Sequence, residues 1–390
     1  MQQFKSIGII GAGAMGGGIA QVAASSGHKV WVYDTNKNAL ASCQQKLADI
    51  LQKLATKGRI PDAKEILDRF SFVSDLADLS DCDLIIEAII ENLDIKKSVF
   101  SALEKIAKPN CVLASNTSSL SITSIASACE KPERVIGIHF FNPAPLMALV
   151  EIIPAIQTDQ SLPGTIKNLM LQWKKAPVIA KDTPGFIVNR VARPFYGEAL
   201  RIYEEGIADI PTIDWAMTEI GGFKMGPFTL MDYIGHDVNF VVTETVFQSF
   251  FYDPRYKPSF SQKRLLEAGW LGRKSGKGFY DYAENAISKP AEKNEALGKK
   301  IAERIVTMLI NEAVDALYLK IASKEDIELA MTKGVNYPKG LLQWCDELGS
   351  DYVLANMDQL YNTYHEDRYR ASVLLREMGS VNAEFSASVS

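Results

Sequence analysis

Cysteine and histidine are scarce in this chain of 390 residues, which contains five cysteines and four histidines. The cysteines form no CxxC pair and are odd in number, and the histidines show no metal-ligand spacing. These absences weigh against a disulfide framework and against a metal site. We therefore expect reduced cysteines and no bound metal.

Long hydrophobic runs are also missing, since no apolar stretch reaches the roughly 18 residues that a bilayer-spanning helix needs. The apolar run near the N-terminus is too short for a secretory signal and leads into a glycine-rich turn. The net charge is −5, so the chain lacks the positive excess that draws proteins to nucleic acid or anionic membranes. We expect a cytoplasmic protein with no nucleic-acid or membrane partner.

In the first half of the chain, short apolar runs alternate with longer segments of helical periodicity. The runs are apolar at nearly every position, which is typical of strands buried on both faces of a sheet. This alternation predicts βαβ units, and therefore an α/β fold with a Rossmann-type doubly wound sheet. The expected strands are 7–10, 30–33, 84–90, 111–114 and 135–140, and the expected helices are 14–26, 38–56 and 93–107.

The second half of the chain is predicted to be helical and to contain an internal repeat. Identities recur at a constant offset of 114 residues, a register that chance matches would not hold. The matching pairs include Arg190 and Arg304, Glu198 and Glu312, Gly226 and Gly340, Asp232 and Asp346, and Gly235 and Gly349. We expect a dinucleotide-binding domain at 1–183 and two copies of one all-α domain at 184–282 and 297–380, joined by a polar linker at 284–295.

A glycine-rich turn after the first predicted strand marks a candidate dinucleotide site. Gly11, Gly13 and Gly16 form a G-x-G-x-x-G motif that opens a predicted helix, and Asp34 ends the next predicted strand. In this fingerprint the glycines let the backbone approach a pyrophosphate at a helix N-terminus. A carboxylate at Asp34 accepts hydrogen bonds from ribose hydroxyls and repels a 2′-phosphate, so we expect NAD rather than NADP. Lys37 is a nearby cation that would favour NADP. FAD proteins share the fingerprint, so it does not name the chemistry.

A histidine at the end of a predicted strand is the first candidate for chemistry. His139 lies in the segment Gly-Ile-His-Phe-Phe-Asn-Pro. Histidine is the residue type whose ordinary titration range suits it to taking up and returning a proton. Glu151 follows twelve residues later in a second apolar strand, 149–153, where a charged side chain needs a partner. A return strand would bring this carboxylate to the imidazole and orient it. The alternatives are a histidine that only fills the core and a glutamate that faces solvent.

Two further segments supply polar groups. Ser118 follows a predicted strand, at the end where open α/β sheets bind ligands, and Asn189 starts the helical half of the chain. Both side chains can donate hydrogen bonds to substrate oxygens. Taken alone, Ser118 is equally compatible with a helix cap and Asn189 with a buried amide.

With these motifs in place, the sequence resembles the 3-hydroxyacyl-CoA dehydrogenase family over nearly its whole length. GAGAMGGGIAQ, ASNTSSLSIT, IHFFNP and DTPGFIVNR occur in the order and spacing of the family. The resemblance implies that His139 is the general acid/base, that Glu151 is its partner, and that Ser118 and Asn189 orient the substrate. The cofactor-binding residues are then expected to be Gly11, Gly13, Gly16, Asp34, Glu91, Lys96, Ser118, Asn142 and Lys274, and Lys57 matches a coenzyme A contact.

The activity that the resemblance implies is NAD-dependent, reversible oxidation of an (S)-3-hydroxyacyl-CoA to a 3-oxoacyl-CoA, as in the β-oxidation of fatty acids. One departure is Ala148, where the family commonly has a lysine or another long side chain, and we expect it to affect the acyl pocket. The duplicated domain is similar to that of multifunctional fatty-acid oxidation subunits, so we expect a monomer with an internal pseudo-dimer, or a homodimer. Two alternatives remain: a β-hydroxyacid or sugar-acid dehydrogenase, which would use a catalytic lysine, and a structural protein of the lens type.

Overall fold

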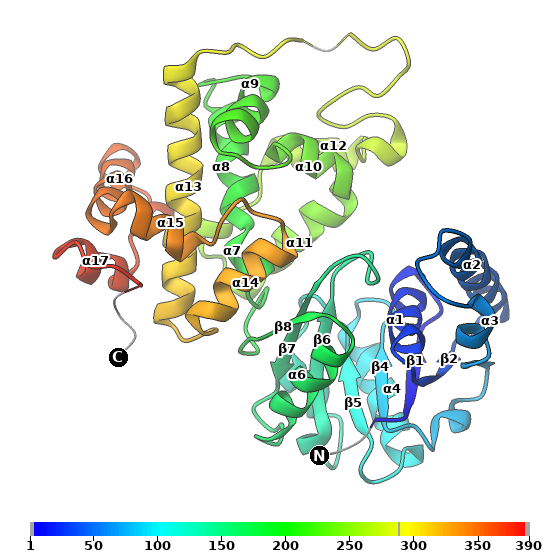
Figure 1. Ribbon diagram of the computed structural model, residues 1–390. Helices are drawn as coiled ribbons and strands as arrows, with labels where there is room; N and C mark the ends of the chain where they lie inside the picture. The colour runs from blue at the N-terminus through cyan, green and yellow to red at the C-terminus, as the bar shows by residue number, and fades with distance from the viewer. Residues whose placement is uncertain (1–3, 288, 387–390) are drawn as a thin grey trace. The chain divides into compact units, whose positions relative to one another are not determined.

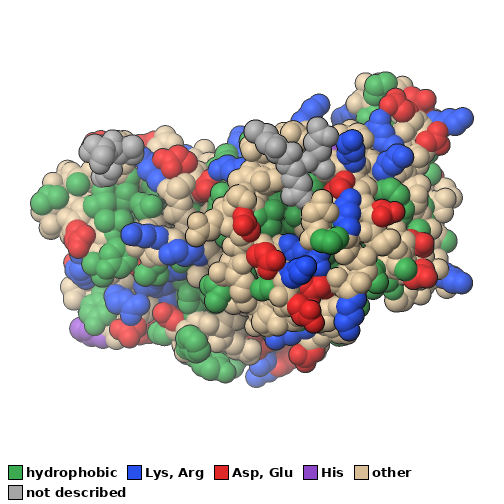
Figure 2. Space-filling model, turned by 90° about the horizontal axis from the view of Figure 1, so that it is seen from below, with side chains coloured by type: hydrophobic (Ala, Val, Ile, Leu, Met, Phe, Trp, Pro, Cys, Tyr) green, Lys and Arg blue, Asp and Glu red, His purple; other side chains and the backbone are tan. Residues whose placement is uncertain are grey.

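The structure is a computed structural model that describes residues 4–287 and 289–386. The chain divides into two compact units, Met1–Phe186 and Ile187–Ser390. None of the helices within the described ranges combines the length and the hydropathy of a membrane-spanning segment. On the face shown in Figure 2, Lys and Arg side chains are interspersed with Asp and Glu side chains, in keeping with the small net charge.

The first unit contains one eight-stranded sheet with helices packed against it (Figure 1). The strand order is β3-β2-β1-β4-β5-β6-β7-β8, and all neighbours run parallel except the antiparallel pair β6 and β7. The winding direction reverses between β1 and β4, which confirms the predicted doubly wound sheet. The strands are β1 (Ser6–Ile10), β2 (Lys29–Tyr33), β3 (Phe70–Val73), β4 (Leu84–Glu87), β5 (Val112–Ser115), β6 (Val135–Phe140), β7 (Leu149–Pro154) and β8 (Ala176–Ile179).

Side-chain caps determine where the longer helices of the first unit begin. Asn36 Oδ1 accepts hydrogen bonds from the amides of Asn38 and Ala39 at the start of α2 (Lys37–Thr56). Asn92 Oδ1 accepts one from the amide of Ile95 at the start of α4 (Leu93–Ile106). The other helices of this unit are α1 (Ala14–Ser25), α3 (Ala63–Leu67), α5 (Ile122–Ala126) and α6 (Leu162–Gln172), with short helical turns η1 (Leu76–Leu79) and η2 (Pro132–Arg134).

The second unit is helical, as predicted, and its longest helix, α13 (Glu295–Tyr318), packs along α8 (Arg193–Glu204) (Figure 1). Because α13 is surrounded by other helices, most of its side chains are buried. The remaining helices are α7 (Val188–Val191), α9 (Ile210–Trp215), α10 (Pro227–Ile234), α11 (His236–Ser249), α12 (Phe260–Glu267), α14 (Lys324–Gly334), α15 (Leu341–Leu348), α16 (Ser350–Tyr364) and α17 (Val373–Gly379). Short helical turns are η3 (Ala216–Ile220), η4 (Pro254–Tyr256), η5 (Arg273–Ser275) and η6 (Asp367–Tyr369).

The two halves of the second unit repeat local details at the offset of 114 residues. Asp214 caps α10 by accepting hydrogen bonds from two amides at its start, and Glu328 caps α15 in the same way. Gly235 and Gly349 follow these two helices with φ of 96° and 94°, a conformation that favours glycine. Repetition at this level of detail supports the duplication inferred from the sequence.

The two halves of the second unit also form buried ion pairs with each other. Arg190 Nε lies 2.7 Å from Glu312 Oε1, and Arg304 Nε lies 3.0 Å from Glu198 Oε2. Because Arg190 corresponds to Arg304 and Glu198 to Glu312, each half supplies the carboxylate that the other half needs, as across a two-fold axis. The tyrosine hydroxyls that complete the two sites are those of Tyr256, which donates to Glu312, and Tyr369, which donates to Glu198.

Candidate active site

The glycine-rich turn between β1 and α1 is shaped by close backbone contacts. A Cβ atom on Gly11, whose φ is 106°, would lie 2.6 Å from the carbonyl oxygen of Ala88, and one on Gly16 would lie 1.8 Å from that of Gly11. Gly13 differs, because a Cβ there would meet no described atom within 4 Å. Gly11 and Gly16 thus shape the turn, while the open space at Gly13, beside the N-terminus of α1, fits a pyrophosphate.

A cavity of about 620 Å³ opens beside this turn. Asp34, at the end of β2, lines it, and its carboxylate is fixed by hydrogen bonds of 2.8 Å from the amides of Ala12 and Asn36. Ile89, Ile90 and other apolar residues form much of the remaining wall. An apolar slot for a base and a carboxylate for ribose hydroxyls fit the adenosine half of a dinucleotide.

A buried carboxylate cluster lies at the same edge of the sheet. The side chain of Lys96 is 1% exposed, and its ammonium lies 2.6 Å from Glu87 Oε1 and 3.4 Å from Glu91 Oε2. Glu91 is 38% exposed and also accepts hydrogen bonds from Thr117 Oγ1 and the amide of Ser118. Burial opposes ionisation of Glu91, but Lys96 and these hydrogen bonds outweigh it and lower the pKa of Glu91. Glu91 thus faces outward with Lys96 buried behind it, and their contacts with a cofactor stay predictions.

His139 and Glu151 face each other directly on the antiparallel strands β6 and β7. Glu151 Oε2 lies 2.7 Å from His139 Nδ1, both side chains are buried, and the rings of Phe141 and Phe186 pack around the imidazole. Within the described ranges, His139 Nε2 has no hydrogen-bond partner. An imidazole held by a carboxylate through one nitrogen, with its second nitrogen available, is suited to taking up and returning a proton.

Four of the sequence-predicted residues of the first unit lie at the carboxyl edge of the parallel strands. Gly11 follows β1, Glu91 follows β4, Ser118 follows β5, and His139 lies near the end of β6. Ligands bind at this edge in open α/β sheets. Asn142 lies in the loop directly after β6, and Lys57 is the exposed residue at the end of α2.

Asn189 and Lys274 belong to the second unit. Asn189 lies on α7, and Lys274 lies in η5, where its ammonium is 2.5 Å from Asp237 Oδ1. The expected contacts of Asn189 with substrate, and of Lys274 and Asn142 with cofactor, stay predictions, as does the coenzyme A contact of Lys57.

Two positioning residues were not found from the sequence. Glu87 is fully buried and accepts hydrogen bonds from Lys96 and from Ser115 Oγ, so it fixes two elements behind Glu91. Asp182 accepts hydrogen bonds from Ser121 and from two amides at the start of α5. The signal for Glu87 was present, because it is a charged residue inside the apolar run 84–90, as Glu151 is within 149–153.

Comparison with known families and structures agrees with this geometry. The family description "3-hydroxyacyl-CoA dehydrogenase, NAD binding domain" matches residues 6–183, and "3-hydroxyacyl-CoA dehydrogenase, C-terminal domain" matches residues 185–282 and 301–384. Together these matches cover most of the chain.

Individual relatives match over different lengths. The 3-hydroxyadipyl-CoA dehydrogenase of Escherichia coli is 36% identical over 97% of this chain and 98% of its own length. A probable 3-hydroxybutyryl-CoA dehydrogenase of Deinococcus radiodurans is 44% identical over 70% of this chain and 99% of its own. A crystal structure of 3-hydroxybutyryl-CoA dehydrogenase from Escherichia coli superposes with a TM-score of 0.92 at 35% identity, covering 98% of this chain and 99% of the other.

Proposed function

Since the chain belongs to the 3-hydroxyacyl-CoA dehydrogenase family, a family of NAD-dependent oxidoreductases, we propose that it reversibly oxidises (S)-3-hydroxyacyl-CoA to 3-oxoacyl-CoA with His139 and Glu151 as its acid/base pair. The observation that carries this proposal is the 2.7 Å contact between His139 Nδ1 and Glu151 Oε2 at the ligand-binding edge of the sheet. The reaction is a step that β-oxidation of fatty acids requires, and we place the enzyme there.

The proposed roles follow from which atoms are engaged. Glu151 accepts a hydrogen bond from Nδ1–H of His139, which keeps Nε2 as the basic nitrogen and stabilises the imidazolium. His139 Nε2 removes the proton of the 3-hydroxyl and returns it in the reverse direction. NAD, when bound, supplies the hydride acceptor. Ser118 and Asn189 orient the substrate oxygens.

The proposal is tested by following NADH absorbance with acetoacetyl-CoA as substrate. We expect oxidation of NADH that depends on the thioester. A lysine-based β-hydroxyacid dehydrogenase would instead oxidise free hydroxy acids and ignore the thioester. A protein with a purely structural role would bind NADH without turnover, and either of these results would contradict the proposal.

We expect the enzyme to prefer NADH to NADPH by at least about tenfold in kcat/KM, because the Asp34 carboxylate would face the 2′-phosphate of NADPH and like charges at close range repel. Measuring kcat/KM for both cofactors tests this. The isosteric variant Asp34→Asn removes the charge and should narrow the preference. Equal values for the wild-type enzyme would mean that Lys37 or another cation accommodates the phosphate.

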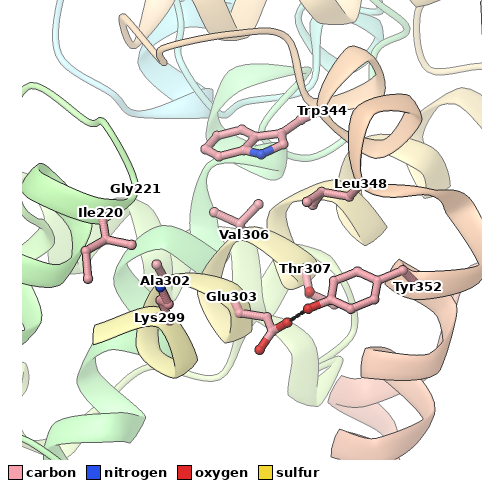
Figure 3. A pocket seen from close by; sticks show the side chains of 10 residues that line it. All are labelled: Ile220, Gly221, Lys299, Ala302, Glu303, Val306, Thr307, Trp344, Leu348 and Tyr352. Carbon is pink, nitrogen blue, oxygen red and sulfur yellow. Dashed lines mark hydrogen bonds between the residues drawn. The ribbon is translucent and has the colours of Figure 1, made fainter. Parts of the chain in front are cut away.

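We also propose that only the first helical copy takes part in the chemistry. At the offset of 114 residues, Glu303 stands where the first copy has Asn189. Glu303 accepts a hydrogen bond from the hydroxyl of Tyr352 (Figure 3). It also accepts one from Asn356 Nδ2, so its carboxylate is engaged inside the second unit. It lines a cavity of about 270 Å³ whose other lining residues are Ile220, Gly221, Lys299, Ala302, Val306, Thr307, Trp344, Leu348 and Tyr352.

Replacing Glu303 with alanine should leave kcat within about twofold, since a change away from a reactive site usually alters free energies by less than ~0.5 kcal/mol. The matched variant at the corresponding position, Asn189→Ala, should lower kcat strongly because it removes a proposed substrate contact. Steady-state kinetics of both variants, with thermal unfolding as a check on folding, decides the matter. A large drop in kcat for a folded Glu303→Ala protein would refute a purely structural second copy.

We further propose that the ion pairs between the two helical copies take the place of contacts between the subunits of a dimer, so that the protein is stable as a monomer. The supporting observation is that Glu198 and Glu312 are each neutralised by an arginine of the other copy. Two copies on one chain associate at an effective concentration on the order of millimolar, well above that of separate subunits.

A further inference from the structure

Among the described residues of the second unit, one buried cation has no anion beside it. Arg193, the first residue of α8, is only 7% exposed. Its Nη1 donates to Thr243 Oγ1 over 3.0 Å, while its Nε has no hydrogen-bond partner in the described part of the chain. The ring of Tyr196 lies 5.0 Å from the guanidinium carbon and provides an aromatic face rather than a counter-charge.

The other buried arginines of this unit are all paired with a carboxylate. The pairs are Arg190 with Glu312, Arg201 with Glu198, Arg255 with Glu312, Arg304 with Glu198, and Arg368 with Glu205. Within residues 187–287 and 289–386, Arg193 is the exception to this pattern. The missing counter-charge is therefore specific to one position.

An arginine keeps its charge in proteins, so Arg193 is a positive charge without a carboxylate partner among the described residues, and its Nε is an unused donor. Burial lowers the pKa of Arg193, and only the buried phenols of Tyr196 and Tyr337 oppose this effect. The hydroxyl of Tyr337 is itself buried with no hydrogen-bond partner among the described residues. A planar anion that accepts from both Arg193 and Tyr337 would satisfy the groups that the fold leaves unsatisfied.

Arg193 is one helical turn away from Asn189. Ala192, between α7 and α8, has φ −81° and ψ −9°, and its amide donates to Val188 O, so the helical path is nearly continuous. Four helical residues advance by about 6 Å, which is within the combined reach of an arginine side chain and a short acyl tail. If Asn189 holds an oxygen near C3, the acyl chain beyond C3 lies within range of the Arg193 guanidinium.

The arginine also belongs only to the copy that carries Asn189. At the offset of 114 residues, the second copy has Thr307 in place of Arg193 and Glu303 in place of Asn189. Arg201 and Arg255 are also confined to the first copy, but each is paired with a carboxylate. Arg193 differs from them because it accompanies the proposed substrate contact Asn189 and has no carboxylate partner among the described residues.

We propose that Arg193 is a specificity-determining residue that pairs with a carboxylate at the far end of the acyl chain, so that the preferred substrate is the CoA thioester of a 3-hydroxy dicarboxylic acid. This inference rests on the proposed function, in particular on Asn189 as a substrate contact. The phosphates of coenzyme A lie at the opposite end of the thioester from the acyl tail, so they are not the anion in question.

The test compares two CoA thioesters with six-carbon acyl chains, 3-hydroxyadipyl-CoA and 3-hydroxyhexanoyl-CoA, which differ only in a terminal carboxylate or methyl group. We expect the wild-type enzyme to favour the adipyl thioester by at least about tenfold in kcat/KM. Arg193→Met should lower kcat/KM for the adipyl thioester by about 10²-fold, because a buried charge pair loses one partner, and leave that for the hexanoyl thioester within about threefold. Arg193→Lys, which retains the charge, should keep part of the preference.

The hexanoyl thioester reports on folding in the same assay, so a misfolded variant cannot be mistaken for a specificity change. Equal losses of Arg193→Met on both substrates would overturn the inference and assign Arg193 a structural role. A wild-type enzyme that turns over both substrates equally well would overturn it as well. If the wild-type enzyme oxidises neither thioester, the proposed function itself is wrong, which is a different result from a lost preference.

Discussion

Replacing His139 with glutamine should lower kcat by about 10²–10⁴-fold, because glutamine cannot take the hydroxyl proton, and general acid/base transfer contributes a factor of this size. Binding of NADH should survive, because the proposed dinucleotide site consists of the glycine turn and Asp34, and neither involves His139. Steady-state turnover of acetoacetyl-CoA and a fluorescence titration with NADH measure the two quantities separately. A variant that keeps more than half of its activity would show that His139 is not the acid/base group.

The neighbouring carboxylate provides a graded version of the same experiment. Glu151→Gln should also be slow, because a neutral partner stabilises the imidazolium less than a carboxylate does. The matched control is His236, a second buried histidine that lies 2.8 Å from a carboxylate, Asp232. Asp232 also accepts hydrogen bonds from the amides of Phe279 and Tyr280, so this pair holds a chain segment in place. His236→Gln should lower the unfolding temperature and leave kcat of the folded protein largely unchanged.

Replacing Glu312 with glutamine should lower the free energy of unfolding by about 3 kcal/mol or more, because removing one partner of a buried ion pair leaves an uncompensated charge. Glu312 is fully buried and pairs with both Arg190 and Arg255, which would keep Asp315 as their shared ion-pair partner. Urea unfolding at neutral pH measures the loss. A change below ~0.5 kcal/mol would mean that the exchanged pairs do not hold the two copies together.

The ionisation of Glu312 also makes the free energy of unfolding depend on pH, and the direction of this dependence follows from the pKa of Glu312. Burial opposes ionisation of Glu312, but Arg255 and Arg190 outweigh it and hold its pKa below the ordinary value of 4.5. A lowered pKa contributes stability that is complete above 4.5 and is lost as the pH falls through the folded-state value. Glu198 is the corresponding carboxylate of the first copy. Burial opposes its ionisation, but Arg201 and Arg304 outweigh this effect and lower its pKa. Glu198→Gln should therefore resemble Glu312→Gln in both the loss of stability and the weaker acid dependence.

The strands that the sequence analysis identified lie mainly inside the sheet, and the two that it missed lie at its edges. β6 matches its predicted range, 135–140, because a strand buried on both faces is apolar at every position. β3 and β8 are the two outermost strands. β3 is only partly buried, and β8 contains Pro177, which edge strands tolerate. β3 therefore lacks a continuous apolar pattern, because Ser71 interrupts it, while β8 is apolar throughout but short and carries a proline, which argues against a strand.

In the candidate site, too, some contacts were predictable from the sequence pattern and others depend on tertiary packing. The contact of His139 with Glu151 follows from two apolar strands joined by a short connection, so spacing alone predicts that they meet. The burial of Lys96 was not predictable in the same way. A lysine near the start of a helix is normally exposed, whereas Lys96 is buried between two carboxylates. Arg193 gave no signal either, because an arginine on a helix normally lies at the surface and only the packed structure shows which one lacks a partner.

The exchange of carboxylates between the two helical copies has a consequence for how the chain is made. Synthesis proceeds from the N-terminus, so α8 leaves the ribosome before any part of α13 exists. Until Arg304 is made, Arg201 is the arginine of the first copy, within the described residues, that pairs with Glu198, and the apolar face of α8 lacks the cover of α13. The nascent first copy is therefore an unfinished structure for the whole time needed to translate the second. We expect a fragment that ends in the linker to expose this apolar face of α8 and therefore to dimerise or aggregate.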